Sequence, residues 1–291
     1  MRIWHLVLLI VMNAFWAATL SVYKPLGVYL DPAGIVTLRF GMAGLCLLVL
    51  WPWLPGPSPR GGDLARSVTM GVLLFVFGQR LQVLGNHLGT AGNSSVLMAL
   101  EPLLTSVAAA VFLREHIGPR RWIGFAVAMS GVALLNGVWR QDFRLAGLVP
   151  SLIFISSFLC ESAYSVIGKP VVQRASVMKV LAIGLLSGTA INVAINGQGT
   201  LAAARTLPPL GWLGLAYLAI ICTVIGYAAW FVIIRQTDVN VAAMTIFAQP
   251  VFGVALAAAW LGEPLHWGQL WGSLAIIGGL GFGLSRQIKR E

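Results

Sequence analysis

Charged residues are scarce in this chain. Only 10% of its 291 residues are Asp, Glu, Lys or Arg, whereas a soluble domain carries about 25%. Hydrophobic residues make up 58%, and the mean hydropathy is +0.86. So much apolar surface needs lipid as its solvent. The composition therefore excludes a soluble globular protein and makes the lipid bilayer the first expected partner.

Cysteine and the known catalytic motifs are also nearly absent. Cys46, Cys160 and Cys222 each lie in an apolar run, with no C-x-x-C pair and no disulfide framework. The chain has no Walker A motif, no HExxH and no nucleophile elbow. We therefore predict no catalytic residues, no metal site and no cofactor, and gradients rather than ATP as the energy source.

Acidic residues are outnumbered by basic ones, 9 against 19, which gives a net charge of +10. The basic residues lie in short loops between apolar runs, as the positive-inside rule requires, so we expect no nucleic-acid partner.

Long apolar runs are abundant. We predict an all-α integral membrane protein with ten transmembrane helices, near residues 4–22, 32–52, 67–86, 91–113, 120–138, 145–167, 178–196, 212–233, 240–261 and 267–285.

The loop charges predict the orientation of these helices. Only Lys24, Arg140, Arg144 and Arg205 fall in loops on the side opposite the termini, and Arg39 and Arg80 lie inside spans. The remaining basic residues share the side of both termini, so the N- and C-termini are expected in the cytoplasm.

One pattern occurs twice at an offset of 148 residues. Two prolines, Pro102 and Pro250, begin the two copies, and each is followed by Ala-Ala, Leu, Glu, Gly and Gly at equal spacing. We divide the chain into residues 1–141 and 142–291. Each half then holds five spans, and an odd number requires the halves to have opposite topology around a central cavity.

Several motifs carry a family resemblance over almost the whole chain: Asn13-Ala14-Phe15-Trp16-Ala17, Arg39-Phe40, Pro102…Glu115…Gly124…Gly131 and its second copy Pro250…Glu263…Gly272…Gly279. With these, the chain resembles the ten-helix EamA-type members of the drug/metabolite transporter superfamily. In its overall sequence, rather than in a diagnostic motif, it is most similar within them to the YddG-type exporters of aromatic amino acids. The resemblance implies a bacterial inner-membrane protein that works by alternating access, with a cavity lined by spans 1–4 and 6–9.

Two carboxylates lie near the bilayer midplane. Glu101 and Glu161 sit well inside spans, where an ionised carboxylate costs at least about 2.5–3.5 kcal/mol. Each is either an amine-recognising or proton-carrying group, or a structural carboxylate that neighbours satisfy. For Glu161, Ser157 and Tyr164 are candidate neighbours.

Polar side chains form stripes at helical spacing on the third and fourth spans. One stripe consists of Phe75, Gln79, Gln82 and Asn86, and the other of Ser94, Met98, Glu101 and Thr105. Such stripes mark a cavity or interhelical contacts, and two on successive spans favour a cavity.

The remaining spans supply further candidates for a substrate site. The repeat pairs Gln79 with Tyr227 and Glu101 with Gln249. The predicted site is completed by Asn13, Trp16, Tyr164 and Trp230. Any single aromatic residue among them is also compatible with simple packing.

Other residues receive hinge or structural roles. Pro102 and Pro250 are predicted hinges, because a proline within a helix frees a carbonyl and permits bending. Arg39 is assigned a structural role, whereas Arg80 is left open as a gate or an ion-pair partner. Glu115 and Glu263 are expected to cap the next helix or to pair with Arg120 or His266.

Four glycines, Gly268, Gly272, Gly279 and Gly283, share one face of the last span. This face serves either a homodimer or packing within the chain, and the sequence does not decide between them.

The function that these patterns favour is a secondary transporter of a small-molecule substrate, exporting amphipathic metabolites such as amino acids, aromatic ones included. The alternative is a nucleotide-sugar or other phosphorylated-metabolite carrier of the same superfamily, although spans 7, 9 and 10 lack the basic residues that phosphate needs. An intramembrane enzyme using Glu101 and Glu161 is a remote alternative.

Overall fold

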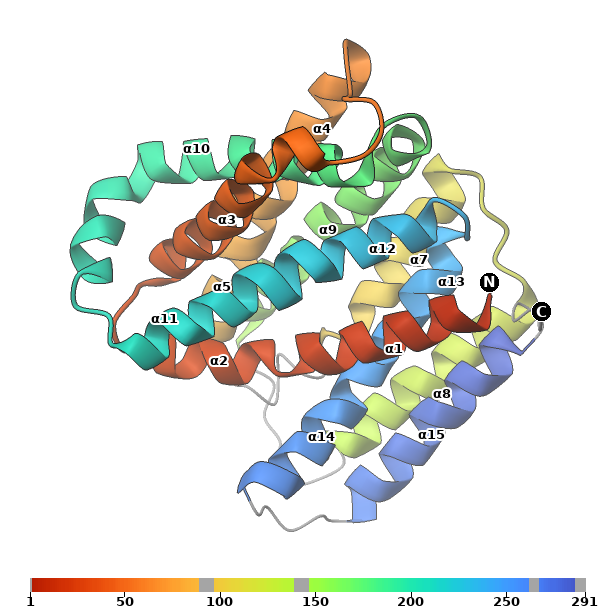
Figure 1. The fold of residues 1–291 in the computed structure, drawn as a ribbon. Coiled ribbons are helices and arrows are strands. Elements are labelled where there is room, and N and C mark those ends of the chain that lie inside the picture. Colours follow the sequence, from red (N-terminus) through yellow and green to blue (C-terminus); the bar gives the residue numbers. More distant parts are fainter. Residues whose placement is uncertain (1, 89–96, 139–146, 262–266, 286–291) are drawn as a thin grey trace.

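The computed structural model describes residues 2–88, 97–138, 147–261 and 267–285 (Figure 1). Within these residues the chain is helical and contains no strand. The predictions for Ser94, Glu263 and His266 lie outside the described residues.

The helices of the first half overlap the predicted ranges, with ends that differ by several residues. They are α1 (Ile3–Ala17), α2 (Thr19–Leu26), α3 (Pro32–Val49), the short η1 (Trp51–Trp53), α4 (Gly62–Val72), η2 (Leu73–Gly78), α5 (Gln79–Leu88), α7 (Leu100–Phe112) and α8 (Pro119–Leu135).

The helices of the second half do the same. They are α9 (Leu148–Arg174), α10 (Val177–Ala204), α11 (Pro209–Ala216), η3 (Tyr217–Ile225), α12 (Gly226–Ile234), α13 (Val239–Met244), η4 (Thr245–Phe247), α14 (Ala248–Leu261) and α15 (Trp267–Leu284).

Within the described part of the chain, seven helical segments are long and apolar enough to cross a membrane. They are Ile3–Tyr23, Pro32–Val49, Gly62–Leu88, Leu148–Arg174, Val177–Ala204, Pro209–Ile234 and Val239–Leu256. The helix α7 is apolar but shorter, and α8 and α15 are not among the seven. An integral membrane fold is therefore confirmed, whereas the count of ten spans stays a prediction.

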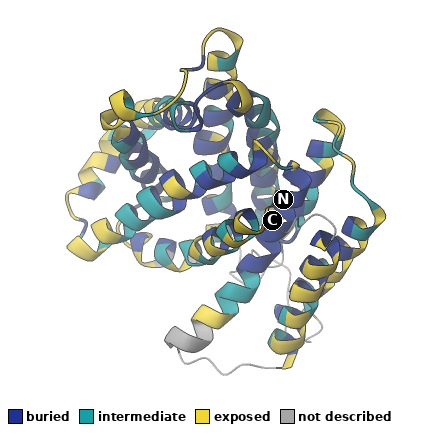
Figure 2. Cartoon of the chain, turned by 45° about the vertical axis from the view of Figure 1, so that its right-hand side comes forward, coloured by how far each residue is buried: buried dark blue, intermediate teal, exposed yellow. Residues whose placement is uncertain are grey.

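Large apolar side chains face outward around the molecule, as lipid requires. Exposed examples include Val111, Phe112, Leu213 and Trp271. Figure 2 shows buried residues toward the centre and exposed residues along the outer faces of the helices. Exposing so many apolar side chains to water would cost free energy, so this surface is suited to contact with hydrocarbon.

The pair α8 and α15 packs through glycines. A Cβ atom added at Gly272 would lie 2.6 Å from the carbonyl oxygen of Gly131, and one at Gly279 would lie 2.8 Å from that of Gly124. The residue numbers rise along one helix as they fall along the other, so the helices are antiparallel. Only glycine permits this backbone approach. The glycine face of α15 is thus buried within the chain, and a homodimer through it would have to displace α8.

Close packing also joins α3, α4 and α10. Gly71 of α4 meets the backbone of Gly184 in α10, where an added Cβ would lie 2.3 Å from the Gly184 Cα. In α3, Gly41 lies against Thr189 of α10, and Gly44 lies against Leu185 and Leu186 of α10. These helices form a second packed group, which α12 and α1 separate from the pair α8 and α15 (Figure 1).

Glu115 links three helices at the side where the sequence predicts the cytoplasm. Its Oε1 accepts hydrogen bonds from Lys169 Nζ at 2.7 Å and from the Val239 amide at 2.8 Å. Its Oε2 accepts from the Asn240 amide and side chain. The expected cap of the following helix and pairing with Arg120 are therefore wrong: Glu115 caps α13, which only the tertiary fold brings near, and pairs with Lys169 of α9.

The first prediction concerns the glycine contact. Replacing Gly272 by Ala should destabilise the protein by about 1–3 kcal/mol, because the added methyl meets the Gly131 backbone. The matched control is Gly278 of the same helix, where an added Cβ meets nothing within 4 Å. Gly278→Ala should be neutral or stabilising, since Ala favours the helix by roughly 0.5–1 kcal/mol. Apparent melting temperatures in detergent measure both, and equal shifts would refute the contact.

The second prediction concerns Glu115 and pH. Burial alone would raise the pKa of the Glu115 carboxyl, but hydrogen bonds from Asn240, Lys169 and Val239 hold that pKa below its ordinary value. A lowered pKa stabilises the fold above the unfolded-state value, about 4.3, and this stability is lost as the pH falls through the folded-state pKa. Glu115→Gln should therefore cost about 1–3 kcal/mol at pH 7.

The difference between the wild type and Glu115→Gln should shrink in melting experiments as the pH falls from 7 to below 4. A difference that stays constant over this range would show that the carboxylate charge contributes nothing to stability.

Candidate functional site

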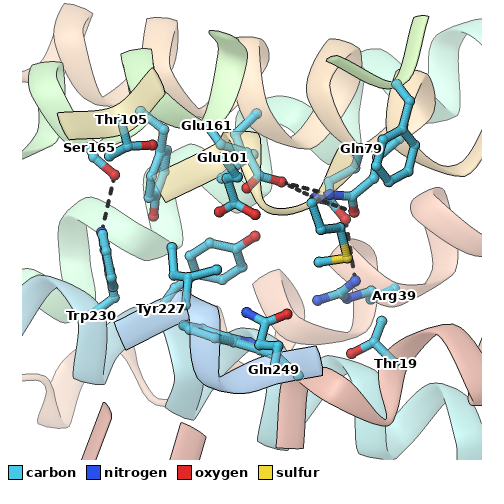
Figure 3. Close-up of a pocket in the computed structure, with 17 residues that line it drawn as sticks. Thr19, Arg39, Gln79, Glu101, Thr105, Glu161, Ser165, Tyr227, Trp230 and Gln249 are labelled. Atoms are coloured by element: carbon cyan, nitrogen blue, oxygen red, sulfur yellow. Dashed lines mark hydrogen bonds between the residues drawn. The ribbon is translucent and has the colours of Figure 1, made fainter. Parts of the chain in front are cut away.

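A cavity of about 100 Å³ lies between the packed groups of helices (Figure 3). Most of the side chains predicted for a substrate site line it, namely Trp16, Gln79, Gln82, Met98, Glu101, Glu161, Tyr164, Tyr227, Trp230 and Gln249. Seven further lining residues were not predicted as site residues: Thr19, Arg39, Leu74, Thr105, Phe154, Ser165 and Ile246. Residues far apart in sequence thus meet at one place, but whether they bind a substrate stays a prediction.

Asn13 was predicted to line the site but lies behind the lining. Its side chain is fully buried, and its Oδ1 accepts a hydrogen bond from Gln249 Nε2 at 2.9 Å. Its own Nδ2 donates to the Leu9 carbonyl and to Thr245. Asn13 therefore orients Gln249 rather than facing the cavity.

The acidic side of the cavity is formed by α7 and α9. Glu101 lies in the first turn of α7 and Glu161 near the middle of α9, and Figure 3 shows their carboxyl groups facing the same space. Glu161 Oε1 accepts hydrogen bonds from Gln79 Nε2 and Gln82 Nε2, both at 3.1 Å. The glutamines of α5 thus hold one carboxyl group in place.

The sequence analysis offers Ser157 and Tyr164 as hydrogen-bond partners of Glu161, and neither residue bonds to it in the structure. Ser157 instead donates to the Phe154 carbonyl of its own helix. The hydroxyl of Tyr164 is buried and has no hydrogen-bond partner among the described residues. Buried hydroxyl groups are rarely left in this state, so Tyr164 offers the cavity a group still able to bond.

A basic group lies near the carboxyl pair and is linked to Glu161 through Gln79. Arg39 of α3 is 3% exposed, and its Nε donates to Thr223 Oγ1 at 2.9 Å. Its Nη1 donates to the Tyr23 hydroxyl and, at 3.3 Å, to Gln79 Oε1. The guanidinium also lies 5.0 Å from the centre of the Phe40 ring.

Sequence reasoning missed this position of Arg39. The signal that pointed to it was an arginine within an apolar run, residues 32–52, that contains no acidic residue. Such a cation must find its partner on another helix or in a cavity. Arg80, by contrast, donates to Asn192 Oδ1 at 2.8 Å and is not among the lining residues.

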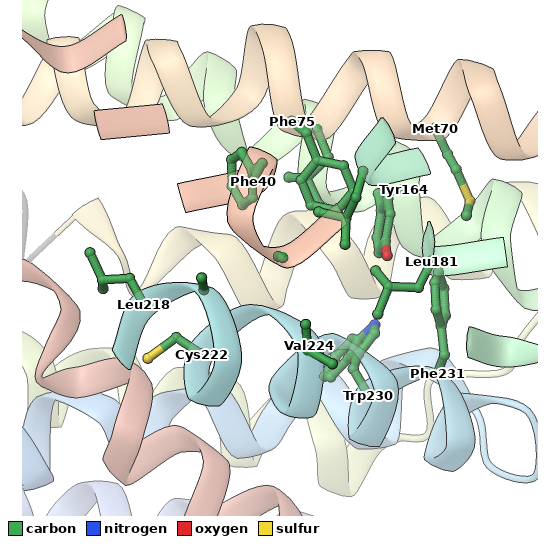
Figure 4. Close-up of a cluster of buried hydrophobic side chains, with 14 of the residues drawn as sticks. Phe40, Met70, Phe75, Tyr164, Leu181, Leu218, Cys222, Val224, Trp230 and Phe231 are labelled. Carbon is green, nitrogen blue, oxygen red and sulfur yellow. The ribbon is translucent and has the colours of Figure 1, made fainter. Parts of the chain in front are cut away.

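Aromatic rings form the wall beside these charges. Tyr227 lies 5.5 Å from the ring centres of both Phe75 and Tyr164, and 6.2 Å from that of Trp16. Figure 4 shows Phe75 and Tyr164 within a larger buried cluster. Trp230 is fixed by a hydrogen bond from its Nε1 to Ser165 Oγ at 3.1 Å. The cavity therefore has a rigid apolar wall.

Irregular turns of helix lie directly beside the lining residues. The π-helical segment η2 ends immediately before Gln79, and the π-helical segment η3 ends two residues before Tyr227. Such segments are rare and often mark functional sites. These segments could not be predicted from the sequence, because a π-turn depends on packing from neighbouring helices.

The two predicted hinge prolines lie at helix starts rather than within continuous helices. Pro102 is in the first turn of α7, after a turn at Met98 and Ala99, and Pro250 is in the first turn of α14, after the 3-10 segment η4. A proline in the first turn removes no helical hydrogen bond. A turn that departs from regular α-helix therefore precedes each proline, in place of a kink within a continuous α-helix.

The cavity offers charges of both signs, amide groups and aromatic faces. Among the described residues, no group of three or more His, Cys, Asp or Glu side chains could hold a metal ion. This arrangement suits reversible binding of a small polar solute with an apolar part.

Comparisons with known proteins identify similar transporters. A "Probable terminal-alkyne amino-acid exporter" of Streptantibioticus cattleyicolor is 26% identical, over 95% of this chain and 91% of its own length. The "Uncharacterized inner membrane transporter YedA" of Escherichia coli is 28% identical, over 80% of this chain and 75% of its own. A solved structure titled "Crystal structure of protein" shares the fold with a TM-score of 0.78, at 17% identity and with 99% of both chains covered.

The family model described as the EamA-like transporter family matches this chain twice, over residues 3–137 and again over residues 149–284. The two matches together cover nearly all of the sequence, and the names of the relatives point to transport rather than to an enzyme. The chain belongs to the EamA-like transporter family.

Proposed function

We propose that this protein is a secondary transporter that exports amino acids, aromatic ones included, by alternating access. The observation that carries the proposal is the pair of carboxyl groups, Glu101 and Glu161, facing one cavity beside an aromatic wall. The name of the Streptantibioticus relative, an amino-acid exporter, supports the same substrate class.

The carboxyl pair favours a cationic group. Glu101 is 8% exposed, and no described Lys or Arg forms an ion pair with it or with Glu161. Two carboxylates held close repel each other, more strongly where water is excluded. An ammonium group between them would relieve this repulsion and supply hydrogen-bond donors.

The aromatic wall favours an apolar side chain on the same solute. The rings of Tyr227, Trp16 and Trp230 border the space next to the carboxyl groups. Aromatic faces bind both aromatic rings and aliphatic groups through dispersion and through edge-to-face contacts. A solute with a polar end and an apolar end fits both surfaces at once.

An inverted repeat would explain how the cavity opens to either side of the membrane. Gly124 and Gly272 are separated by the repeat offset, as are Gly131 and Gly279. The contact between Gly124 and Gly279 is therefore the repeat counterpart of the contact between Gly131 and Gly272. A reciprocal contact between antiparallel helices is what a two-fold axis in the membrane plane requires.

The turns before Pro102 and Pro250 lie at the same offset and next to the cavity residues Glu101 and Gln249. A turn that departs from regular α-helical hydrogen bonding is a natural place for a helix to bend, which is the property that a hinge needs. The proposed location is a bacterial inner membrane with both termini in the cytoplasm, in line with the name of the Escherichia coli relative.

A carrier of phosphorylated metabolites is the competing function. Arg39 is the one basic residue that lines the described cavity, and it shares the cavity with two carboxyl groups. A phosphate dianion would meet repulsion from these groups, whereas phosphate sites collect several cations. Purified protein in liposomes should therefore take up labelled amino acids, and nucleotide sugars alone as substrates would overturn the proposal.

The third prediction tests the carboxyl pair. Glu101→Gln and Glu161→Gln should each lower amino-acid transport about 10- to 100-fold, the equivalent of a lost hydrogen bond to a charged group. Transport is measured in proteoliposomes with and without a pH gradient. If Glu101→Gln leaves both the rate and its pH dependence unchanged, the carboxyl group is structural.

The control for these variants is Asp63→Asn. Asp63 forms ion pairs with Arg174 and Arg66, far from the cavity lining and partly in solvent. Exposed ion pairs contribute little, so this variant should transport like the wild type.

The fourth prediction tests the orientation. Green fluorescent protein fused after Glu291 should fluoresce in a bacterial host, because it folds in the cytoplasm. Alkaline phosphatase fused after Arg205, in the connection between α10 and α11, should be active, because that connection is expected outside. The opposite pattern would contradict the proposed topology.

A further inference from the structure

The charge on Arg39 has no carboxylate partner among the described residues. Its three hydrogen-bond acceptors are Thr223, Tyr23 and Gln79, all of them neutral. A guanidinium has five N–H donors, and no described residue accepts a bond from the Nη2 atom. Buried cations are normally paired with an anion, and this one borders a cavity.

The three neutral partners fix the direction of the guanidinium. Tyr23 comes from α2, Thr223 from η3 and Gln79 from α5, so helices from both halves of the chain hold one side chain. The group is also packed on the ring of Phe40. An arginine held in this way is preorganised and loses little conformational freedom when an anion binds.

The bonds of Gln79 indicate which chemical groups fit between Arg39 and Glu161. Its Oε1 accepts from Arg39 Nη1 at 3.3 Å, while its Nε2 donates to Glu161 Oε1 at 3.1 Å. An acceptor thus faces the cation and a donor faces the carboxylate. The carboxylate and ammonium of an α-amino acid present the same order of groups, with charges that strengthen both contacts.

We propose that Arg39 binds the α-carboxylate of the substrate while Glu101 and Glu161 bind its ammonium group, so that the cavity selects zwitterionic amino acids over amines. This inference rests on the proposed function, because it concerns the same cavity. It adds a specificity-determining residue and excludes simple organic cations as the preferred substrates.

The aromatic wall completes this arrangement. Tyr227 and Trp230 lie on the side of the cavity away from Gln79 (Figure 3), so a side chain attached to the α-carbon would reach them while both charged ends are bound. The free hydroxyl of Tyr164 is a further donor beside the same space.

The test compares L-phenylalanine with three relatives in proteoliposomes: phenylalaninamide, which lacks the carboxylate, phenethylamine, which lacks the whole carboxyl group, and N-acetylphenylalanine, which lacks the ammonium. The wild type should transport phenylalanine with a KM about 10- to 100-fold below that of each relative, as expected for a lost charge-assisted contact. Equal KM values for phenylalanine and its amide would overturn the inference.

Variants then assign the carboxylate contact to Arg39. Arg39→Gln should raise the KM for phenylalanine about 10- to 100-fold and leave that for phenylalaninamide within about twofold, because only the first loses an ionic partner. Arg39→Lys should recover part of the affinity. Arg80→Gln is the matched control, since Arg80 is a membrane arginine outside the lining, and it should keep the ratio of the two KM values.

The outcomes separate this inference from the proposed function. If the wild type transports no amino acid at all, the proposed function fails. If it transports phenylalanine and Arg39→Gln weakens the acid and the amide equally, transport of amino acids stands and the assignment of Arg39 is wrong.

Discussion

The cost of placing charge inside a membrane governs this structure. Arg39 and Glu161 lie within helices long and apolar enough to cross a membrane, and Glu101 lies in the shorter apolar helix α7; hydrocarbon offers such groups no hydrogen bonds. The chain meets this cost by turning all three toward one cavity and by surrounding them with neutral polar groups such as Gln79 and Thr223. The helices must therefore pack tightly elsewhere while leaving this space open between them.

Glycine makes the tight packing possible. Contacts such as Gly131 with Gly272 and Gly71 with Gly184 bring helix backbones together without side chains between them. The pair α8 and α15 thereby stands beside the cavity and contributes no residue to its lining. Glu115 adds polar contacts between helices, since its carboxylate joins the end of α7 to α9 and to the start of α13 through hydrogen bonds. Close packing and the bonds of Glu115 hold the scaffold together, and the turns next to Glu101 and Gln249 are where we propose that the helices bend.

Much of the cavity lining could be predicted from the sequence, because a small number of simple rules governs where polar residues lie in a membrane protein. Glu101 and Glu161 were recognisable because carboxylates are costly in an apolar run, and Gln79 and Gln82 because they share a helical face. Arg39 obeyed the same rule as the carboxylates, yet its place in the cavity depends on Thr223, which lies 184 residues away. Asn13 shows the opposite case: its helical face was right, but the side chain of Gln249 stands between it and the cavity.

By itself, the sequence determined that the chain is a membrane protein, where its apolar helices lie and which polar residues had to face inward, because each of these follows from local composition and the cost of transfer into lipid. The tertiary structure decided what those residues meet. It paired Glu115 with Lys169 and α13, buried the glycine face of α15 against α8, and joined Arg39 to Glu161 through the side chain of Gln79. These outcomes depend on which helices become neighbours, and a periodic pattern along one helix contains no information about the helix packed against it.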